Sequence, residues 1–295
     1  MLTVLMQFIF SGITIGAVYA LVGLGFNIIY NATSIINLAQ GEFVVLGGLL
    51  MWFFTESLKL NFFVSILLTL LSAGLVGLLM ERLTIRPLKG ADLLLMIMIT
   101  VAVSIVLRGL IMYKFGKDPY GYAPFTSGEP VMILGAVMQQ QVLWVLGITL
   151  SLIGLVYLFF NKTMLGKAMS ACAVNPVAAR LVGINVSKMI MISFVLSAIL
   201  GAVGGIAITP ISLMEYDKGP ALAVKGFCAA IMGGLGQGMG AVVGGFIIGI
   251  LESLTAGYIH SGFKDAVALV IMLAILVFKP SGIFGSKSVM QVRKF

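Results

Sequence analysis

Two carboxylates stand out among the side chains of this 295-residue sequence that could do chemistry. Glu252 falls in the middle of a long apolar stretch, where an ionised group is costly and is usually paired or functional. We therefore expect Glu252 either to form a structural pair with a cation or to line a path through the protein. Glu42 follows Gln40-Gly41 at the start of another apolar stretch. Because the dipole of a helix favours a negative side chain there, we expect Glu42 to cap that helix.

Few other residues suit catalysis or metal binding. The chain holds one histidine, His260, and two cysteines, Cys172 and Cys228, whose number and spacing match neither a metal cluster nor a redox pair. We expect the cysteines to be small packing residues. A phosphate loop, G-x-x-x-x-G-K-S/T, does not occur, because Gly166-Lys167-Ala168 and Gly285-Ser286-Lys287 both have the wrong neighbours. The sequence therefore predicts no catalytic residues, no metal ligands and no cofactor bound by this chain.

Glycines crowd one region and predict a break between helices. Gly233, Gly234 and Gly236 begin a run that continues to Gly240, and so many glycines allow a helix to end and another to start. The next glycines, in Gly245–Gly249, form a G-x-x-x-G pattern that is typical of close packing between two helices.

The elements that must position these residues are membrane-spanning helices. Apolar residues make up 60% of the sequence and charged residues 9%, against about 45–50% and 25% in soluble domains. The apolar runs do not alternate as the strands of a barrel do, and backbone groups in hydrocarbon must bond within helices or closed barrels. We expect an all-α, polytopic membrane bundle forming one domain over residues 1–295. The net charge of +8 resides mainly in short loops and does not indicate nucleic-acid binding.

About eight or nine segments are expected to be membrane helices. They lie at about 4–29, 41–55, 61–80, 92–113, 142–160, 189–213, 224–236, 240–258 and 264–278. The Gly-rich segment 224–236 and the polar-tipped stretch Asn31–Gln40 are candidates for re-entrant or broken helices. The number of spans and the side of the N-terminus therefore stay open.

Basic residues cluster in three places, and such clusters mark cytoplasmic loops. The first basic residue is Lys59, and most of the others fall into three groups: Arg82, Arg86 and Lys89; Lys162, Lys167, Arg180 and Lys188; Lys279, Lys287, Arg293 and Lys294. We expect these groups, and with them the C-terminus, to face the cytoplasm.

Two stretches share a pattern that indicates two related halves. Gln40–Gly48 and Gln237–Gly245 place Gln, Gly, Val, Gly and Gly at the same spacing, and each opens an apolar segment. Transporters are often built from such repeats, with the path between them. Coincidence among glycines at packing positions explains the pattern equally well.

The expected cytoplasmic loop 161–188 is too long for a simple connection and predicts a short helix. Asn175 is a good N-cap, Pro176 suits the first helical position, and Gly183 suits a left-handed stop. A helix this short is not stable alone, so we expect it to dock on a partner protein, with attachment to lipid as the alternative. The docking residues would be Asn175, Pro176, Ala179, Arg180, Leu181, Val182 and Gly183.

Several longer motifs extend over nearly the whole chain. They are Asn37–Glu42, Glu81–Leu88, Gly166–Ala168, Ala179–Asn185, Gly233–Gly236 with Gly244-Gly245, Lys264–Val267 and Lys279–Gly285. Together they resemble the permease subunits of branched-chain amino acid ATP-binding cassette (ABC) transporters, of the LivH type in the LivH/LivM family.

The resemblance implies an importer subunit that translocates branched-chain or other small amino acids across a prokaryotic plasma (inner) membrane. It implies four kinds of partner: the lipid bilayer, a second, LivM-like permease, two cytoplasmic subunits that hold ATP and Mg²⁺, and an extracytoplasmic binding protein. The helix after Asn175 would be the coupling helix that contacts an ATP-binding subunit. The translocation path or helix breaks along it would involve Gln40, Gly41, Glu42, Gly233, Gly234, Gly236 and Glu252.

Three alternatives differ in function. A permease for urea or short amides is one, because such permeases share this architecture. An ion-coupled secondary transporter would need ionisable residues within the membrane, and only Glu252 clearly lies in the middle of a span. A membrane enzyme would need a His, Cys or Asp/Glu cluster at catalytic spacing, which the sequence lacks.

Overall fold

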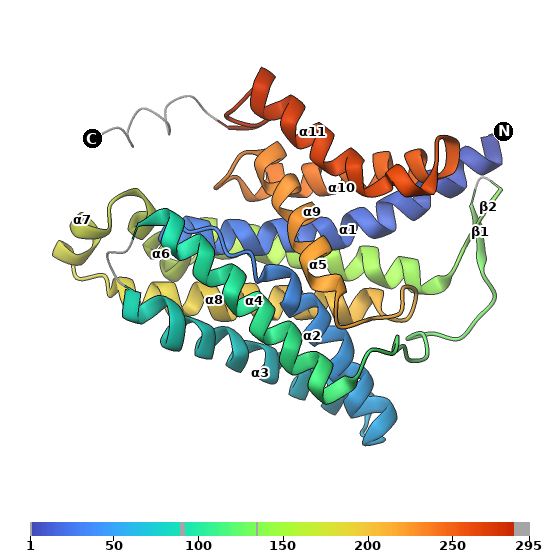
Figure 1. Cartoon of the computed structure of the whole chain (residues 1–295), viewed down its shortest axis with the longest axis horizontal. Helices are drawn as coiled ribbons and strands as arrows, with labels where there is room; N and C mark the ends of the chain where they lie inside the picture. The colour runs from blue at the N-terminus through green and yellow to red at the C-terminus, as the bar shows by residue number, and fades with distance from the viewer. Residues whose placement is uncertain (1, 89–91, 134, 286–295) are drawn as a thin grey trace.

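The computed structural model describes residues 2–88, 92–133 and 135–285, and it is built mainly of helices (Figure 1). Within these ranges seven helices are long and apolar enough to cross a membrane. These spans are built around α1 (Leu2–Thr33), α3 (Phe62–Met80), α4 (Leu93–Phe115), α5 (Gln140–Lys162), α8 (Val186–Ile208), α10 (Gly238–Tyr258) and α11 (Lys264–Phe278). Helices suit these sequences because their backbone groups bond internally and need no water.

Two shorter helices complete the bundle. They are α2 (Gln40–Trp52), extended by a π-helical turn at Phe53–Ser57, and α9 (Lys218–Gly233). With them, each of the nine segments expected from the apolar pattern corresponds to a helix. The break expected in the Gly-rich region lies between α9 and α10, where Gly234 and Gly236 have φ angles of 100° and 92°.

Shorter elements extend or precede the long helices. After α3 the chain continues through a π-helical turn, Glu81–Ile85, into a 3₁₀ turn, Arg86–Leu88. This turn contains Pro87, which fits the end of a helix because proline lacks the backbone N–H. A second 3₁₀ turn, Ser261–Phe263, precedes α11.

The central helix is α1, which contacts α5, α8, α9 and α10, while α2 packs against both α8 and α9 (Figure 1). The peripheral helices α3, α4, α5 and α11 leave large apolar side chains exposed, among them Leu71, Leu110, Leu155 and Val277. In a membrane, exposed apolar faces of this kind contact lipid or another subunit.

Glycines bring α1 and α10 into close contact. A Cβ atom on Gly245 would lie 2.4 Å from the backbone nitrogen of Ala20, and one on Gly249 would lie 2.4 Å from the carbonyl oxygen of Gly12. Real Cβ atoms do not come this close to a neighbour, so only glycine permits the observed separation. The G-x-x-x-G pattern thus packs α10 against the central helix.

The two ends of the bundle carry different additions (Figure 1). At one end lie two short helices, α6 (Met164–Val174) and α7 (Pro176–Leu181). At the other end lies an antiparallel hairpin of β1 (Val131–Ile133) and β2 (Ala136–Met138), in which Val131 pairs with Met138. The expected all-α bundle therefore includes one small hairpin, and the expected loop 161–188 holds two helices where one was predicted.

The described basic groups gather at the α7 end. The turn that carries Arg82 contacts α8, whose first residue, Val186, follows α7 closely. Lys162 and Lys167 lie where α5 meets α6. Lys279 begins the segment after α11, and this segment bonds to the end of α9. The remaining expected members, Lys89, Lys287, Arg293 and Lys294, lie outside the described residues.

Candidate functional site

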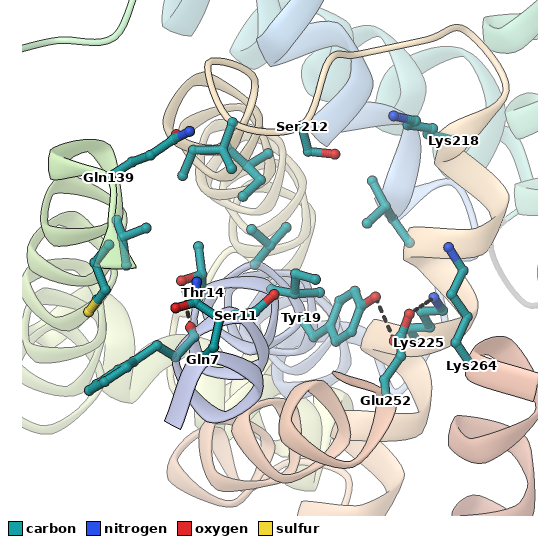
Figure 2. A pocket seen from close by; sticks show the side chains of 18 of the residues that line it. Gln7, Ser11, Thr14, Tyr19, Gln139, Ser212, Lys218, Lys225, Glu252 and Lys264 are labelled. Carbon is teal, nitrogen blue, oxygen red and sulfur yellow. Dashed lines mark hydrogen bonds and ion pairs between the residues drawn. The ribbon is translucent and has the colours of Figure 1, made fainter. Parts of the chain in front are cut away.

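A cavity of about 730 Å³ opens between α1, α5, α8, α9 and α10 on the side of the hairpin (Figure 2). β2 contributes Val137 and Met138 to its wall. Much of the remaining wall is apolar, with Ile15, Val18 and Ile208 among the lining residues. Its polar and charged lining residues are Gln7, Ser11, Thr14, Tyr19, Gln139, Ser212, Lys218, Lys225, Glu252, Lys264 and Asp265.

A network of four side chains forms one wall of this cavity, and Figure 2 shows three of them, Tyr19, Lys225 and Glu252. Lys225 Nζ, on α9, donates to Glu252 Oε1 on α10 at 2.6 Å and lies 2.7 Å from Asp265 Oδ1 on α11. The Tyr19 hydroxyl, on α1, donates to Glu252 Oε2 at 2.8 Å. The ammonium of Lys225 also lies 5.4 Å from the centre of the Tyr19 ring. Four helices are thus joined through one lysine and one glutamate.

Glu252 forms the pair with a cation that was one of the two expectations for it, and it also borders this cavity. Its residue is 5% exposed, its carboxylate pairs with Lys225, and it lines the cavity. Tyr19, Lys225 and Asp265 were not recognised as site residues from the sequence. A buried carboxylate needs a cation, so Glu252 indicated a lysine or arginine on a neighbouring helix. The sequence did not indicate which residue that is.

Gln40, at the start of α2, joins three helices. Its amide Nε2 donates to the carbonyl oxygen of Ser197 on α8 at 3.1 Å, and its Oε1 accepts from the Ser197 hydroxyl at 2.6 Å. The same hydroxyl lies 2.8 Å from the carbonyl oxygen of Gly25 on α1. Gly41 faces α9, because a Cβ atom there would lie 1.9 Å from the carbonyl oxygen of Gly219. Both residues hold helices together and neither lines the cavity described above.

Glu42 does not cap its helix, and that prediction is wrong. Within the described residues, no side chain makes a capping hydrogen bond at the N-terminus of α2. Glu42 Oε1 instead accepts a hydrogen bond from the hydroxyl of Ser104 on α4 at 2.7 Å. The residue is 1% exposed and its carboxylate lies against Gly219 at the start of α9. Glu42 stays in the first turn of α2, but its side chain turns across to α4, where the Ser104 hydroxyl gives it a direct hydrogen bond.

The break between α9 and α10 is held from two directions. The side chain of Asn27 accepts from Gly236 N at 2.8 Å, and that of Asn31 donates to the Gly236 carbonyl oxygen at 3.1 Å. From the other side, Ile283 N and Phe284 N donate to the carbonyl oxygens of Met232 and Gly233. Gly236 also borders a second cavity, of about 320 Å³, whereas Gly233 and Gly234 border neither cavity.

α7 is a capped helix with an exposed apolar end. The side-chain oxygen of Asn175 accepts from the backbone N–H groups of Val177 and Ala178, each at 3.0 Å. Gly183, with a φ angle of 88°, provides the left-handed stop. Ala179 is buried among side chains of α6 and α8, whereas Leu181 and Val182 are 84% and 76% exposed.

The described residues contain no group of three or more His, Cys, Asp or Glu side chains that could hold a metal ion. Cys172 and Cys228 are both buried and free. The site combines an open cavity with charged side chains in its wall and, at the opposite end of the bundle, an exposed short helix.

Comparisons with known proteins match nearly the whole chain. A family model described as the permease component of the branched-chain amino acid transport system matches residues 8–277. The high-affinity branched-chain amino acid transport system permease LivH of Escherichia coli K12 is 28% identical over 303 residues, covering 97% of each chain. The permease BraD of Pseudomonas aeruginosa is 29% identical, covering 97% of this chain and 98% of its own. A probable LivH permease of Methanocaldococcus jannaschii is 29% identical, covering 90% and 88%.

Proposed function

The chain belongs to the family of permease components of branched-chain amino acid transport systems, and on this premise we propose that it forms half of the pore of an ABC importer. The proposed solutes are branched-chain or other small amino acids, as in the names of its relatives. Because those relatives transport amino acids, urea and short amides are not favoured as solutes. The observation that carries the proposal is a solute-sized cavity at one end of the bundle and an exposed, capped helix at the other.

The proposed assembly includes a second, LivM-like permease, two ATP-binding subunits and an extracytoplasmic binding protein in a prokaryotic plasma membrane. The ATP-binding subunits hold ATP and Mg²⁺, so this chain moves the solute without acting on it chemically. Basic residues at the α7 end support a cytoplasmic position for that end and for the C-terminus. The hairpin and the mouth of the cavity then face the binding protein.

The proposed role of α7 is to transmit movement from an ATP-binding subunit to the bundle. Its caps at Asn175 and Gly183 keep a short helix intact, and Ala179 joins it to the body of the protein. Leu181 and Val182 offer apolar surface to a partner, and burying one such side chain contributes about 1.5–3 kcal/mol. Arg180, exposed on the same helix, adds a charge that favours one register on an acidic rim.

Leu181→Asp tests this proposal in the reconstituted importer. A charge in place of the exposed leucine should prevent docking, so leucine uptake and the ATPase activity stimulated by the loaded binding protein should both be lost. Gly183→Val, which strains the left-handed stop, should have the same effect. The matched control is Leu181→Met, which keeps an exposed apolar side chain at the same position and should leave uptake and stimulation unchanged. If Leu181→Asp and Gly183→Val both keep wild-type uptake and stimulation, α7 does not couple the subunits.

A further inference from the structure

The cavity wall places three lysines next to an apolar surface, and one of them, Lys218, is paired with Glu215 just outside the lining. The charged residues of the lining are the lysines at 218, 225 and 264 and the carboxylates Glu252 and Asp265. Aliphatic side chains such as Ile15, Val18 and Leu222 line the same space. A solute that fits both features has a branched aliphatic part and a negatively charged end.

Lys225 is the cation best placed to meet that charged end. Its side chain is 10% exposed, so water screens its charge little, and it is already paired with the buried carboxylate of Glu252. An ammonium group has three N–H donors. Within the described part of the chain, Glu252 and Asp265 receive two of them, which leaves one for a molecule in the cavity.

The two carboxylates on Lys225 are held differently. Glu252 is 7% exposed at its side chain and is fixed by the Tyr19 hydroxyl as well. Asp265 is 66% exposed and sits at the beginning of the peripheral helix α11. Because Asp265 is exposed, its carboxylate is hydrated again when it leaves the lysine, and the buried lysine keeps Glu252 as a partner. Asp265 is thus the exchangeable partner and Glu252 the permanent one.

We propose that Lys225 binds the carboxylate of the solute, and that this carboxylate replaces Asp265 on the lysine. The released Asp265 carboxylate then faces the α-ammonium group of the same zwitterion, so no charge is left without an opposite one. This inference rests on the proposed function and adds the chemical group that the permease recognises. It selects amino acids over uncharged amides of the same shape, because only a carboxylate can take the place of Asp265.

Isovalerate and isovaleramide test the proposal, since they share a branched chain and differ in the charge at one end. Their binding is measured by saturation-transfer NMR titration of the detergent-purified complex of permeases and ATP-binding subunits, without the binding protein. The wild-type complex should bind isovalerate more tightly than isovaleramide. Lys225→Met should remove that preference, with a loss of about tenfold or more for isovalerate, the size expected for a charge-assisted hydrogen bond.

Asp265→Asn is the decisive second variant, because it leaves the buried Lys225–Glu252 pair in place and keeps the proposal testable if Lys225→Met does not fold. It removes the competing carboxylate, so isovalerate should bind several-fold more tightly while isovaleramide is unchanged. Lys59→Met is the matched control: Lys59 pairs with Glu56 at 3.1 Å, does not line the cavity and should have no effect.

Two results would overturn the inference: no preference for isovalerate in the wild-type complex, or a preference that Asp265→Asn leaves unchanged. Leucine uptake by the complete wild-type importer, measured in parallel, separates this failure from that of the proposed function. If uptake occurs but the carboxylate preference is absent, only the role of Lys225 is wrong. If the wild type takes up no leucine at all, the proposed function itself fails.

Discussion

Two neighbouring glycines of α8, Gly204 and Gly205, allow a sharp test of how tightly the centre of the bundle is packed. A Cβ atom on Gly205 would lie 1.9 Å from the carbonyl oxygen of Val44 and 2.8 Å from the backbone nitrogen of Gly48, both on α2. A Cβ atom on Gly204 would meet only the side chain of Leu21, at 3.5 Å, which is ordinary contact.

The magnitude follows from comparing Gly205→Ala with Gly204→Ala. Ordinary contact starts at 3.4 Å, so the new methyl group on Gly205 is about 1.5 Å too close to a backbone that cannot rotate away. Overpacking of this kind costs about 1–3 kcal/mol or more. The gain in helix propensity from Gly to Ala, up to about 1 kcal/mol, is the same at both positions and cancels in the comparison.

The assay is the apparent melting temperature of the purified complex, together with leucine uptake in proteoliposomes. Gly205→Ala should melt at least about 2 °C below Gly204→Ala. Uptake should fall only in Gly205→Ala, because α2 displaced from α8 also shifts α9, the helix that carries Lys225. Equal melting temperatures and equal uptake for the two variants would refute the close approach of α2 and α8.

Three further predictions concern other parts of the molecule. Asn175→Ala removes both cap hydrogen bonds of α7 and should cost about 1 kcal/mol of helix stability. We expect a partial loss of stimulated ATPase activity, and full stimulation would argue against the cap. Glu252→Ala should lower the melting temperature more than Tyr19→Phe, because the first variant leaves the mostly buried Lys225 with Asp265 alone and the second removes only one hydrogen bond. The reverse order would contradict the network. The purified chain alone should not hydrolyse ATP, and activity that persists after trace ATPases are removed would disprove this.

Local features of the site could be predicted from the sequence, and α7 shows why. Its N-cap, first-turn proline and left-handed glycine act within nine positions of one another, and each has a strong intrinsic preference for its place. The apolar segments were equally predictable, because the membrane requires helices wherever the chain is long and apolar. The break after Gly233 follows from backbone geometry that glycine adopts more easily than other residues.

The contacts between helices could not be predicted in the same way. Lys225 and Glu252 are 27 positions apart, and Tyr19 and Glu252 are 233 positions apart. Only the packing of α1, α9 and α10 brings the three residues together. The apolar periodicity of a helix does not indicate which other helices are its neighbours. Glu42 shows the opposite error: a local rule about helix dipoles predicted a cap, while a hydroxyl 62 positions away on α4 provides the partner.

The attachment of α11 to α9 has a mechanical consequence. The two helices are joined at one end by Lys225 and Asp265 and, beyond the other end of α11, by the backbone bonds of Ile283 and Phe284 to the last residues of α9. On α9 these attachments lie at Lys225, in the middle of the helix, and at Met232 and Gly233, at its end, which is about 11–12 Å along a stiff rod. Two attachments prevent both sliding and rotation of one helix against the other. Loss of the Lys225–Asp265 contact alone leaves α11 held beyond its far end and through the apolar contacts of Ala268, Ile271 and Met272, so only its first turn, which carries Asp265, is released from α9.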